Sequence, residues 1–328
     1  MKVFITGATG FIGKNTVKCL IESGHECRCL VRETSKKDAL EKIGCQLVTG
    51  DITDRESLTK GIKGCDAVIN LANLYSYWEP NVRLYEKINI DGTRNVMESA
   101  LASGMKKVVH VSSIVTWGRT SDVPVNEESP IGEHTSEYAR TKYEGDKVAW
   151  ELYETKGLPL VMIYPCGVLG ADDPKITGDL IKQIINGKMP VRGLESIVFT
   201  WVHVKDVAES IVRALEKEDN LGERYIIGKE QCSVGEFNKA VSEIAGLSLQ
   251  FLSAPNAVVK FNAFFLTALA NLTKNPPAWG LSIDFVNNAI TGFRADGSKA
   301  ERELGISYTP VRKAIEECVE SFQSKPNT

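Results

Sequence analysis

The chain has 328 residues, of which 43% are hydrophobic and 25% are charged, and its formal net charge is −3. This length suits one large domain or two moderate ones with a substantial core. Lysines and glutamates are interleaved without a basic stripe, which argues against a nucleic-acid partner. The eight cysteines include no Cys-x-x-Cys pair, so we expect reduced core residues in a cytoplasmic protein, with neither a disulfide framework nor a metal site.

The opening stretch, Lys2 to Gly13, predicts a strand, a glycine turn and a helix. Val3 to Ile5 form a short apolar run typical of a buried strand, and Gly7, Gly10 and Gly13 follow at intervals of three. Glycine suits a turn with unusual dihedrals, a close approach of backbone to a pyrophosphate, and tight packing of helix on strand. The helix N-terminus would then bind the phosphates. Because the first strand begins at residue 2, we expect no signal peptide.

The strand and helix patterns that follow alternate along the chain. We expect helices at 11–23, around Leu58 and Ile62, at 82–103 and at 134–156, and strands at 25–31, 46–48, 67–71, 107–113 and 160–164. This alternation predicts an α/β fold with a Rossmann-type doubly wound parallel sheet. We expect a dinucleotide-binding domain over 1–170, joined again by 199–228. The remainder of 171–328 would be a smaller, mostly helical substrate lobe with helices near 203–217, 233–246, 257–272, 281–290 and 310–322.

The end of the second predicted strand bears on which dinucleotide binds. Folds that prefer NAD place an acidic residue there to bind the ribose hydroxyls. This chain has Val31 followed by Arg32, so no carboxylate repels a 2′-phosphate. Arg32, with Ser35 and either Lys36 or Lys37, could bind that phosphate through charge-assisted contacts, which favours NADP over NAD. The alternative is that Arg32 stacks on the adenine or faces solvent.

A pair of residues on the predicted helix 134–156 carries the chemistry. Tyr138 and Lys142 are four residues apart and so share one helix face. Ser113 lies at a strand end twenty-five residues before Tyr138, with the adjacent Ser112 as the alternative. A carbonyl that accepts hydride needs a proton donor and a hydrogen-bond donor, roles that suit Tyr138 and Ser113. Lys142, together with the positive nicotinamide of the oxidised cofactor, would lower the phenol pKa by favouring the phenolate, and it would also hydrogen-bond the ribose.

Together, the Gly-x-x-Gly-x-x-Gly turn, the strand-end serine and Tyr-x-x-x-Lys resemble the extended branch of the short-chain dehydrogenase/reductase superfamily. The resemblance implies that Asn89, in the middle of a helix, shapes the proton path to the active site. It also implies that strand ends contact the cofactor. The implied cofactor-binding residues are Gly7, Thr9, Gly10, Phe11, Ile12, Gly13, Arg32, Lys36, Asp51, Ile52, Leu71, Ala72, Tyr138, Lys142, Pro165 and Val168.

The loop after the fourth predicted strand is rich in aromatic residues. Tyr75, Tyr77 and Trp78 follow a strand's carboxyl end, where ligands of open α/β sheets bind, so with Ser113 they are candidates for a substrate wall. Ordinary loop packing is the alternative.

The turn Pro-x-x-Val-x-Gly at 165–170 resembles dihydroflavonol reductases and hydroxysteroid dehydrogenases. The Leu-Tyr-Ser-Tyr-Trp-Glu-Pro loop resembles dihydroflavonol reductase-like proteins labelled hopanoid-associated sugar epimerases. In nucleotide-sugar members an arginine that holds the diphosphate stands where this chain has Ile197.

These observations favour an NADP-dependent reductase that acts on the carbonyl of an apolar or aromatic small molecule. A sugar or nucleotide-sugar epimerase with tightly bound cofactor is the alternative enzyme, and a catalytically silent cofactor sensor is the alternative of another class. The resemblance implies a homodimer through 82–103 and 134–156. The apolar segment 257–272 is interrupted by Lys260 and is too short to span a bilayer, so we expect a buried helix there. Peripheral membrane contact or a dimer face is the alternative.

Overall fold

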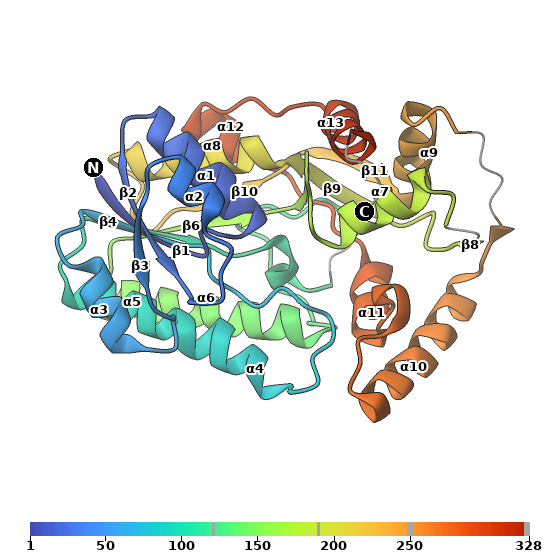
Figure 1. Cartoon of the computed structure of the whole chain (residues 1–328), viewed down its shortest axis with the longest axis horizontal. Coiled ribbons are helices and arrows are strands. Elements are labelled where there is room, and N and C mark those ends of the chain that lie inside the picture. Colours follow the sequence, from blue (N-terminus) through green and yellow to red (C-terminus); the bar gives the residue numbers. More distant parts are fainter. Residues whose placement is uncertain (120–121, 189–190, 248–251, 325–328) are drawn as a thin grey trace.

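The computed structural model describes residues 1–119, 122–188, 191–247 and 252–324, and within them the largest layer is a seven-stranded parallel sheet (Figure 1). The strand order is β3-β2-β1-β4-β5-β6-β10, the doubly wound order of a dinucleotide-binding fold. The predicted fold class is therefore confirmed. The strands are β1 Lys2–Thr6, β2 Glu26–Val31, β3 Gln46–Thr49, β4 Ala67–Asn70, β5 Lys107–Val111, β6 Leu160–Pro165 and β10 Arg224–Ile227.

The central strands are apolar because helices cover both faces of the sheet. Val3, Phe4 and Ile5 of β1 are fully buried, and Ile5 lies beside Ile69 of β4 in the parallel register. Helices α1 (Phe11–Glu22) and α8 (Val204–Glu216) pack together on one face, while α3 (Arg55–Ile62), α5 (Thr93–Ala102) and α6 (Glu137–Lys156) cover the other (Figure 1). Two short helices, α2 (Asp38–Lys42) and α12 (Ser298–Leu304), are additions to the predicted elements.

The helix predicted over 82–103 is present, but only part of it has α-helical geometry. It consists of α4 (Arg83–Tyr85), a π-helical stretch over Glu86–Gly92, and α5. A π-helical stretch inserts an extra residue per turn and often marks a functional site. Here it contains Asn89, whose backbone oxygen lies against Gly145 of α6, so closely that a Cβ at position 145 would overlap it.

The smaller lobe contains two short sheets besides its helices. In the described residues these are β7 (Gly167–Leu169), β9 (Val198–His203) and β11 (Glu230–Ser233) in one sheet, and β8 (Val191–Arg192) with β12 (Leu252–Ser253) in the other. A second core, which includes Leu169, Trp201, Phe237 and Ile315, lies between the first of these sheets and helices of the lobe. The lobe helices are α7 (Ile176–Ile185), α9 (Val234–Ile244), α10 (Asn256–Thr273), α11 (Ile283–Thr291) and α13 (Val311–Gln323).

Within the described part of the chain, no helix is both long and apolar enough to cross a membrane. The same residues contain no group of three or more His, Cys, Asp or Glu side chains that could hold a metal ion. All eight cysteines are described and free, and burial raises the pKa of the Cys27 thiol to about 12.

The contact between Gly145 and the π-helical stretch generates a stability prediction. In Gly145→Ala the new methyl group collides with the Asn89 carbonyl, and such overpacking costs about 1–3 kcal/mol. The free energy of unfolding, measured by urea denaturation, should fall by that amount. Glu151→Ala, on the exposed side of the same helix, should change it by less than about 0.5 kcal/mol. Equal stability of the two variants would contradict the packing described here.

Candidate active site

A cavity of about 1700 Å³ opens along the carboxyl edge of the main sheet. Its lining extends from the glycine turn after β1, past the ends of β4, β5 and β6, to α7, α10 and α11 of the smaller lobe. Pockets for one drug-sized ligand occupy about 300–1,000 Å³. The cavity is therefore large enough for a dinucleotide and a second small molecule.

The glycine turn leaves no room for side chains at the dinucleotide end of the cavity. Gly7 has a φ of +72°, and a Cβ there would lie 2.6 Å from the Leu71 carbonyl carbon and 2.7 Å from the Ala72 nitrogen. A Cβ on Gly13 would overlap the Gly7 carbonyl oxygen. Helix α1 starts after Gly10 without a side-chain cap and without an acidic residue in its first turn. Its free N–H groups therefore suit a phosphate, and the residues present fit a dinucleotide.

Most of the predicted cofactor-binding residues line this one cavity. Lys36 and Lys142 do not belong to the lining. The predicted residues that do are Gly7, Thr9, Gly10, Phe11, Ile12, Gly13, Arg32, Asp51, Ile52, Leu71, Ala72, Tyr138, Pro165 and Val168.

Two charged residues, Arg32 and Asp51, line the cavity near the end of β2. Arg32 is exposed, and its backbone N–H donates to the Ser35 hydroxyl at 3.1 Å, so both residues line the same corner. The Asp51 carboxylate faces its own loop, because its Oδ1 accepts from the Thr53 N–H and hydroxyl, each at 2.8 Å. The Arg32 side chain is therefore exposed at this corner, whereas one oxygen of the Asp51 carboxylate is already bound within its own loop.

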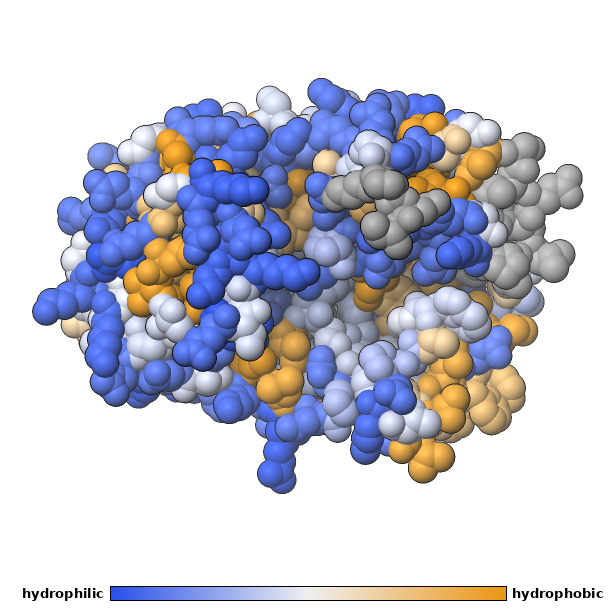
Figure 2. All heavy atoms as spheres, viewed as in Figure 1, coloured by the Kyte–Doolittle hydropathy of each residue, from blue (hydrophilic) through white to orange (hydrophobic). Residues whose placement is uncertain are grey.

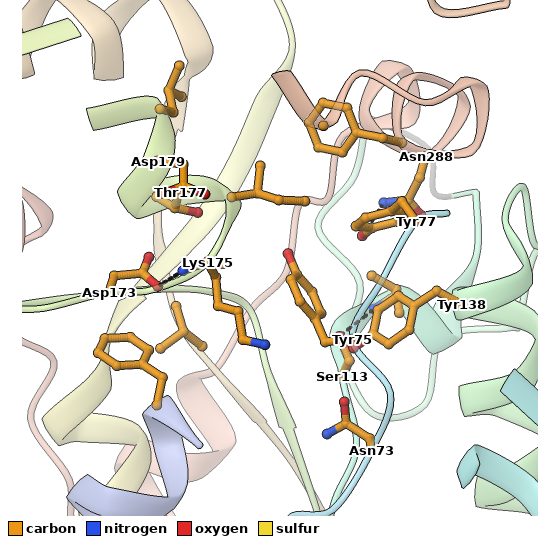
Figure 3. A pocket seen from close by; sticks show the side chains of 18 of the residues that line it. Asn73, Tyr75, Tyr77, Ser113, Tyr138, Asp173, Lys175, Thr177, Asp179 and Asn288 are labelled. Atoms are coloured by element: carbon orange, nitrogen blue, oxygen red, sulfur yellow. Dashed lines mark hydrogen bonds between the residues drawn. The ribbon is translucent and has the colours of Figure 1, made fainter. Parts of the chain in front are cut away.

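Tyr138 and Ser113 meet on the cavity wall (Figure 3). Ser113 precedes a short 3₁₀ turn over Ile114–Trp117 and accepts from the Val115 N–H at 3.4 Å. Tyr138 is 4% exposed, and burial raises the pKa of its phenol, whereas a hydrogen bond with Ser113 lowers it. The phenol is therefore protonated at neutral pH and has a hydroxyl neighbour.

Lys142 lies behind Tyr138 instead of lining the cavity. Its Nζ donates to the Val111 carbonyl at 3.2 Å, and it is 2% exposed. Burial lowers the pKa of Lys142, and the Asp146 carboxylate opposes that shift. In the structure the Lys142 ammonium is turned to the β5 backbone and burial dominates the pKa of the phenol, so the lowering expected from Lys142 together with an oxidised nicotinamide stays a prediction.

A buried polar network crosses the sheet edge beneath these residues. The Thr6 hydroxyl donates to Asn70 Oδ1 at 2.5 Å, and the Asn70 amide lies 3.1 Å from Nδ1 of His110. Nε2 of His110 is 3.3 Å from Asp146 Oδ1, an ion-pair distance without hydrogen-bond alignment. The Ser112 hydroxyl donates to Asp146 Oδ2 at 2.7 Å. Ser112 is thus bound within the network, whereas the adjacent Ser113 is turned to the cavity near Tyr138.

Asn89 is buried and connects two parts of the site. Its Oδ1 accepts from the Leu74 N–H at 2.8 Å, and its Nδ2 donates to the Thr141 hydroxyl at 3.1 Å. It does not line the cavity. Its amide therefore holds the aromatic loop after β4 against α6, the helix of Tyr138.

The aromatic loop supplies two of its three predicted side chains to the cavity. Tyr75 and Tyr77 pack edge-to-face on Tyr138, with ring centroids 5.2 and 5.5 Å away. Tyr77 also accepts from the Asn288 amide of α11 at 2.9 Å. Trp78 lies outside the lining, because its indole N–H reaches α10 and donates to Asn271 at 2.9 Å.

The opposite wall is polar, and the sequence analysis missed it. Asp173, Lys175, Thr177 and Asp179 lie on this side, across the cavity from the three tyrosines (Figure 3). Burial raises the pKa of the Asp173 carboxyl to about 6, although the Lys175 and Gly178 N–H groups both donate to it. The Lys175 ammonium is 5.2 Å from the Tyr75 ring centroid. The signal was the Asp-Asp-Pro-Lys sequence at 172–175, which begins three residues after the end of β7.

Comparisons with known proteins agree with this geometry. A family model described as "NAD dependent epimerase/dehydratase family" matches residues 3–228. The "Putative dihydroflavonol 4-reductase" of Synechocystis is 29% identical, covering 98% of this chain and 94% of the relative. Sterol demethylase protein B of Methylococcus capsulatus is 28% identical, covering 99% of both chains.

A solved structure shows the same fold with a nucleotide bound. The Thermus thermophilus UDP-glucose 4-epimerase in complex with NAD superimposes with a TM-score of 0.80, at 22% identity over 99% of each chain. The family model, the sheet order and the glycine turn lead to one conclusion. The chain belongs to the NAD-dependent epimerase/dehydratase family of extended short-chain dehydrogenases/reductases and is an oxidoreductase-type enzyme of that family.

Proposed function

We propose that this enzyme uses NADPH to reduce a ketone or aldehyde on an apolar or aromatic small molecule. The observation that supports this proposal most is that Tyr138 and Ser113 lie side by side in the cavity lining. Their side chains meet on the wall of one cavity, with the glycine turn at one end and aromatic side chains at the other.

The dinucleotide end would be formed by the residues that line it. Gly7 and the N-terminus of α1 would receive the pyrophosphate, and Arg32 with Ser35 would receive the 2′-phosphate of the adenosine. Asp51, Leu71 and Ala72 would border the adenosine and ribose. When bound, the nicotinamide supplies the hydride.

Tyr138 would donate a proton to the carbonyl oxygen of the substrate. Burial keeps its phenol protonated, which suits an acid in the direction of reduction. Ser113 would donate a hydrogen bond to the same oxygen as negative charge develops there. Lys142 would keep the helix register of Tyr138 against β5 through its bond to Val111, and Asn89 would hold the aromatic loop.

The substrate end favours a ring-containing molecule. Tyr75, Tyr77 and Phe285 present aromatic faces and edges to the cavity. Two relatives support this class, because one is named for a dihydroflavonol and the other for a sterol.

The polar wall favours a second candidate, a sugar or nucleotide-sugar epimerase. Asp173 and Asp179 could accept hydrogen bonds from sugar hydroxyl groups, Lys175 could bind a phosphate, and the Thermus relative is a UDP-glucose 4-epimerase. An epimerase returns its hydride to the substrate and keeps its cofactor. Cofactor that stays bound through purification, with no net NADPH oxidation on any ketone, would favour this candidate over the reductase.

Tyr138→Phe tests the proposed acid. Without the hydroxyl, turnover of aromatic and steroid-like ketones, followed as NADPH oxidation, should fall by about 10²–10⁴-fold. Tyr143→Phe is the matched control, because Tyr143 lies on the same helix, stacks on His134 and does not line the cavity. Turnover by Tyr138→Phe within threefold of the control would remove Tyr138 from the mechanism.

Substitution of Ser113 should mainly lower turnover, whereas substitution of the adjacent Ser112 should mainly lower stability. Ser113→Ala should lower kcat by about 10²–10³-fold with little change in the free energy of unfolding. Ser112→Ala deprives the buried Asp146 carboxylate of a donor and should cost about 1–3 kcal/mol of that free energy, with a smaller loss of kcat. Steady-state kinetics and urea denaturation on both variants measure the two effects. The reverse pattern would assign the hydrogen bond to Ser112.

Arg32→Ala tests the cofactor preference. Loss of a charge-assisted contact of about 1.5–3 kcal/mol should raise the Kd for NADPH by about 10- to 150-fold and leave the Kd for NADH within about threefold. Lys36→Ala is the control, since Lys36 does not line the cavity, and we expect a change of less than about threefold there. Fluorescence titration measures both constants. Tighter binding of NADH than NADPH by the unmodified protein would overturn the NADP assignment.

A further inference from the structure

The prediction of a buried helix at 257–272 is wrong in its burial, because helix α10 packs only its small side against the protein and exposes an apolar stripe to solvent. The stripe residues are between 57% and 82% exposed, and their spacing of three or four places them on one helix face. On the other side of the helix, Ala263 and Ala270 are buried. A helix of a globular protein normally points its apolar side at the core. We name these residues the α10 stripe: Phe261, Phe264, Phe265, Leu269 and Leu272.

The exposed apolar surface continues beyond the helix. Trp279, in the connection from α10 to α11, is 76% exposed, and Val258 at the start of α10 is 47% exposed. In Figure 2 hydrophobic side chains gather at the lower right, where Figure 1 places α10 at the margin of the molecule. Tryptophan is enriched at membrane–water interfaces because its ring is apolar and its N–H is polar.

The charged residues of the chain segment that contains the α10 stripe are of one sign. Between Glu243 and Asp284 the sequence has no acidic residue, and its charged side chains are Lys260 and Lys274, both exposed. This contrasts with the net charge of −3 for the whole chain. Pairing with a second copy through this face would bring lysines together without a carboxylate from the segment to neutralise them. An anionic lipid surface complements both the apolar stripe and the lysines.

We propose that the α10 stripe docks this protein on the surface of a bilayer that contains anionic phospholipid. The helix lies in the plane of the interface with Phe264 and Leu272 among the acyl chains. Lys260 and Lys274 lie at the level of the headgroups. This surface goes beyond the proposed function, and its binding requires neither cofactor nor substrate.

The docking face also borders the cavity. Val258, Phe265 and Trp279 are exposed and line the cavity as well. A lipophilic substrate could therefore pass from the bilayer to Tyr138 without crossing water, a point that rests on the proposed function. Outside the cavity lining, the hydrogen bond from Trp78 to Asn271 joins the end of α10 to the aromatic loop.

Co-sedimentation of the full chain with vesicles tests the docking. The unmodified protein should bind vesicles of phosphatidylcholine with about one quarter phosphatidylglycerol, and omitting the anionic lipid should lower the partition coefficient by about tenfold. Phe264→Glu with Leu272→Glu should lower it by at least about 30-fold. The control, Val82→Glu with Leu221→Glu, replaces exposed apolar residues elsewhere and should change it by less than about threefold.

A second measurement reports on the docked face directly. Lipids brominated in their acyl chains should quench the fluorescence of the unmodified protein and lose most of that effect in Trp279→Phe. Circular dichroism and NADPH titration of the glutamate variants establish that they are folded. Absence of binding to anionic vesicles would overturn the proposal. So would sedimentation equilibrium showing a dimer that Phe264→Glu with Leu272→Glu dissociates, because the stripe would then be a subunit interface.

Discussion

The polar contacts that join the carboxyl ends of β1, β4 and β5 to α6 hold the candidate site together. Thr6, Asn70 and His110 belong to three neighbouring strands, and the last of them lies against Asp146 of α6. These side chains are buried, so a missing partner would leave a desolvated polar group. The same network therefore fixes the glycine turn after β1 and the helix of Tyr138 relative to one another.

Burial of this network also sets the protonation of its members. Burial lowers the pKa of His110, and its Nδ1 faces the Asn70 amide, so the imidazole is neutral with its proton on the nitrogen facing Asp146. On the other side of this imidazole, the Asp146 carboxylate opposes the fall in the pKa of Lys142 that burial causes. The motif Tyr-x-x-x-Lys alone does not predict these opposing effects on the pKa of Lys142, because Asp146 lies outside the motif, one helical turn further along α6.

The parts of the site that could be predicted from the sequence are those in which a local pattern dictates the geometry. Gly7 and Gly13 mark a strand-to-helix turn by spacing alone, and Tyr138 shares a helix face with Lys142 by period alone. The direction of a side chain in a loop has no such pattern. Trp78 turns to Asn271 of α10 while Tyr75 and Tyr77 enter the cavity, a result that depends on tertiary packing.

Asn89 shows a further limit of periodicity. If the helix over 82–103 were regular, a period of 3.6 residues would predict the helix face on which Asn89 lies. The π-helical stretch between Glu86 and Gly92 changes that period, so the prediction of the face fails. The packing against Gly145 and the hydrogen bonds to Leu74 and Thr141 stabilise the π-helical geometry, and all three partners are distant in sequence.

The two ends of the cavity are built by different means, which separates cofactor binding from substrate choice. The dinucleotide end consists of backbone at strand ends, held by the sheet register. The substrate end consists of side chains from α7, α10 and α11, joined to the aromatic loop by contacts such as Asn288 to Tyr77. Substitutions on these helices can change the shape and polarity of the substrate wall without moving β1 or α6. Reductases and epimerases both occur among the relatives of this chain, which agrees with a common sheet combined with a lobe of variable lining.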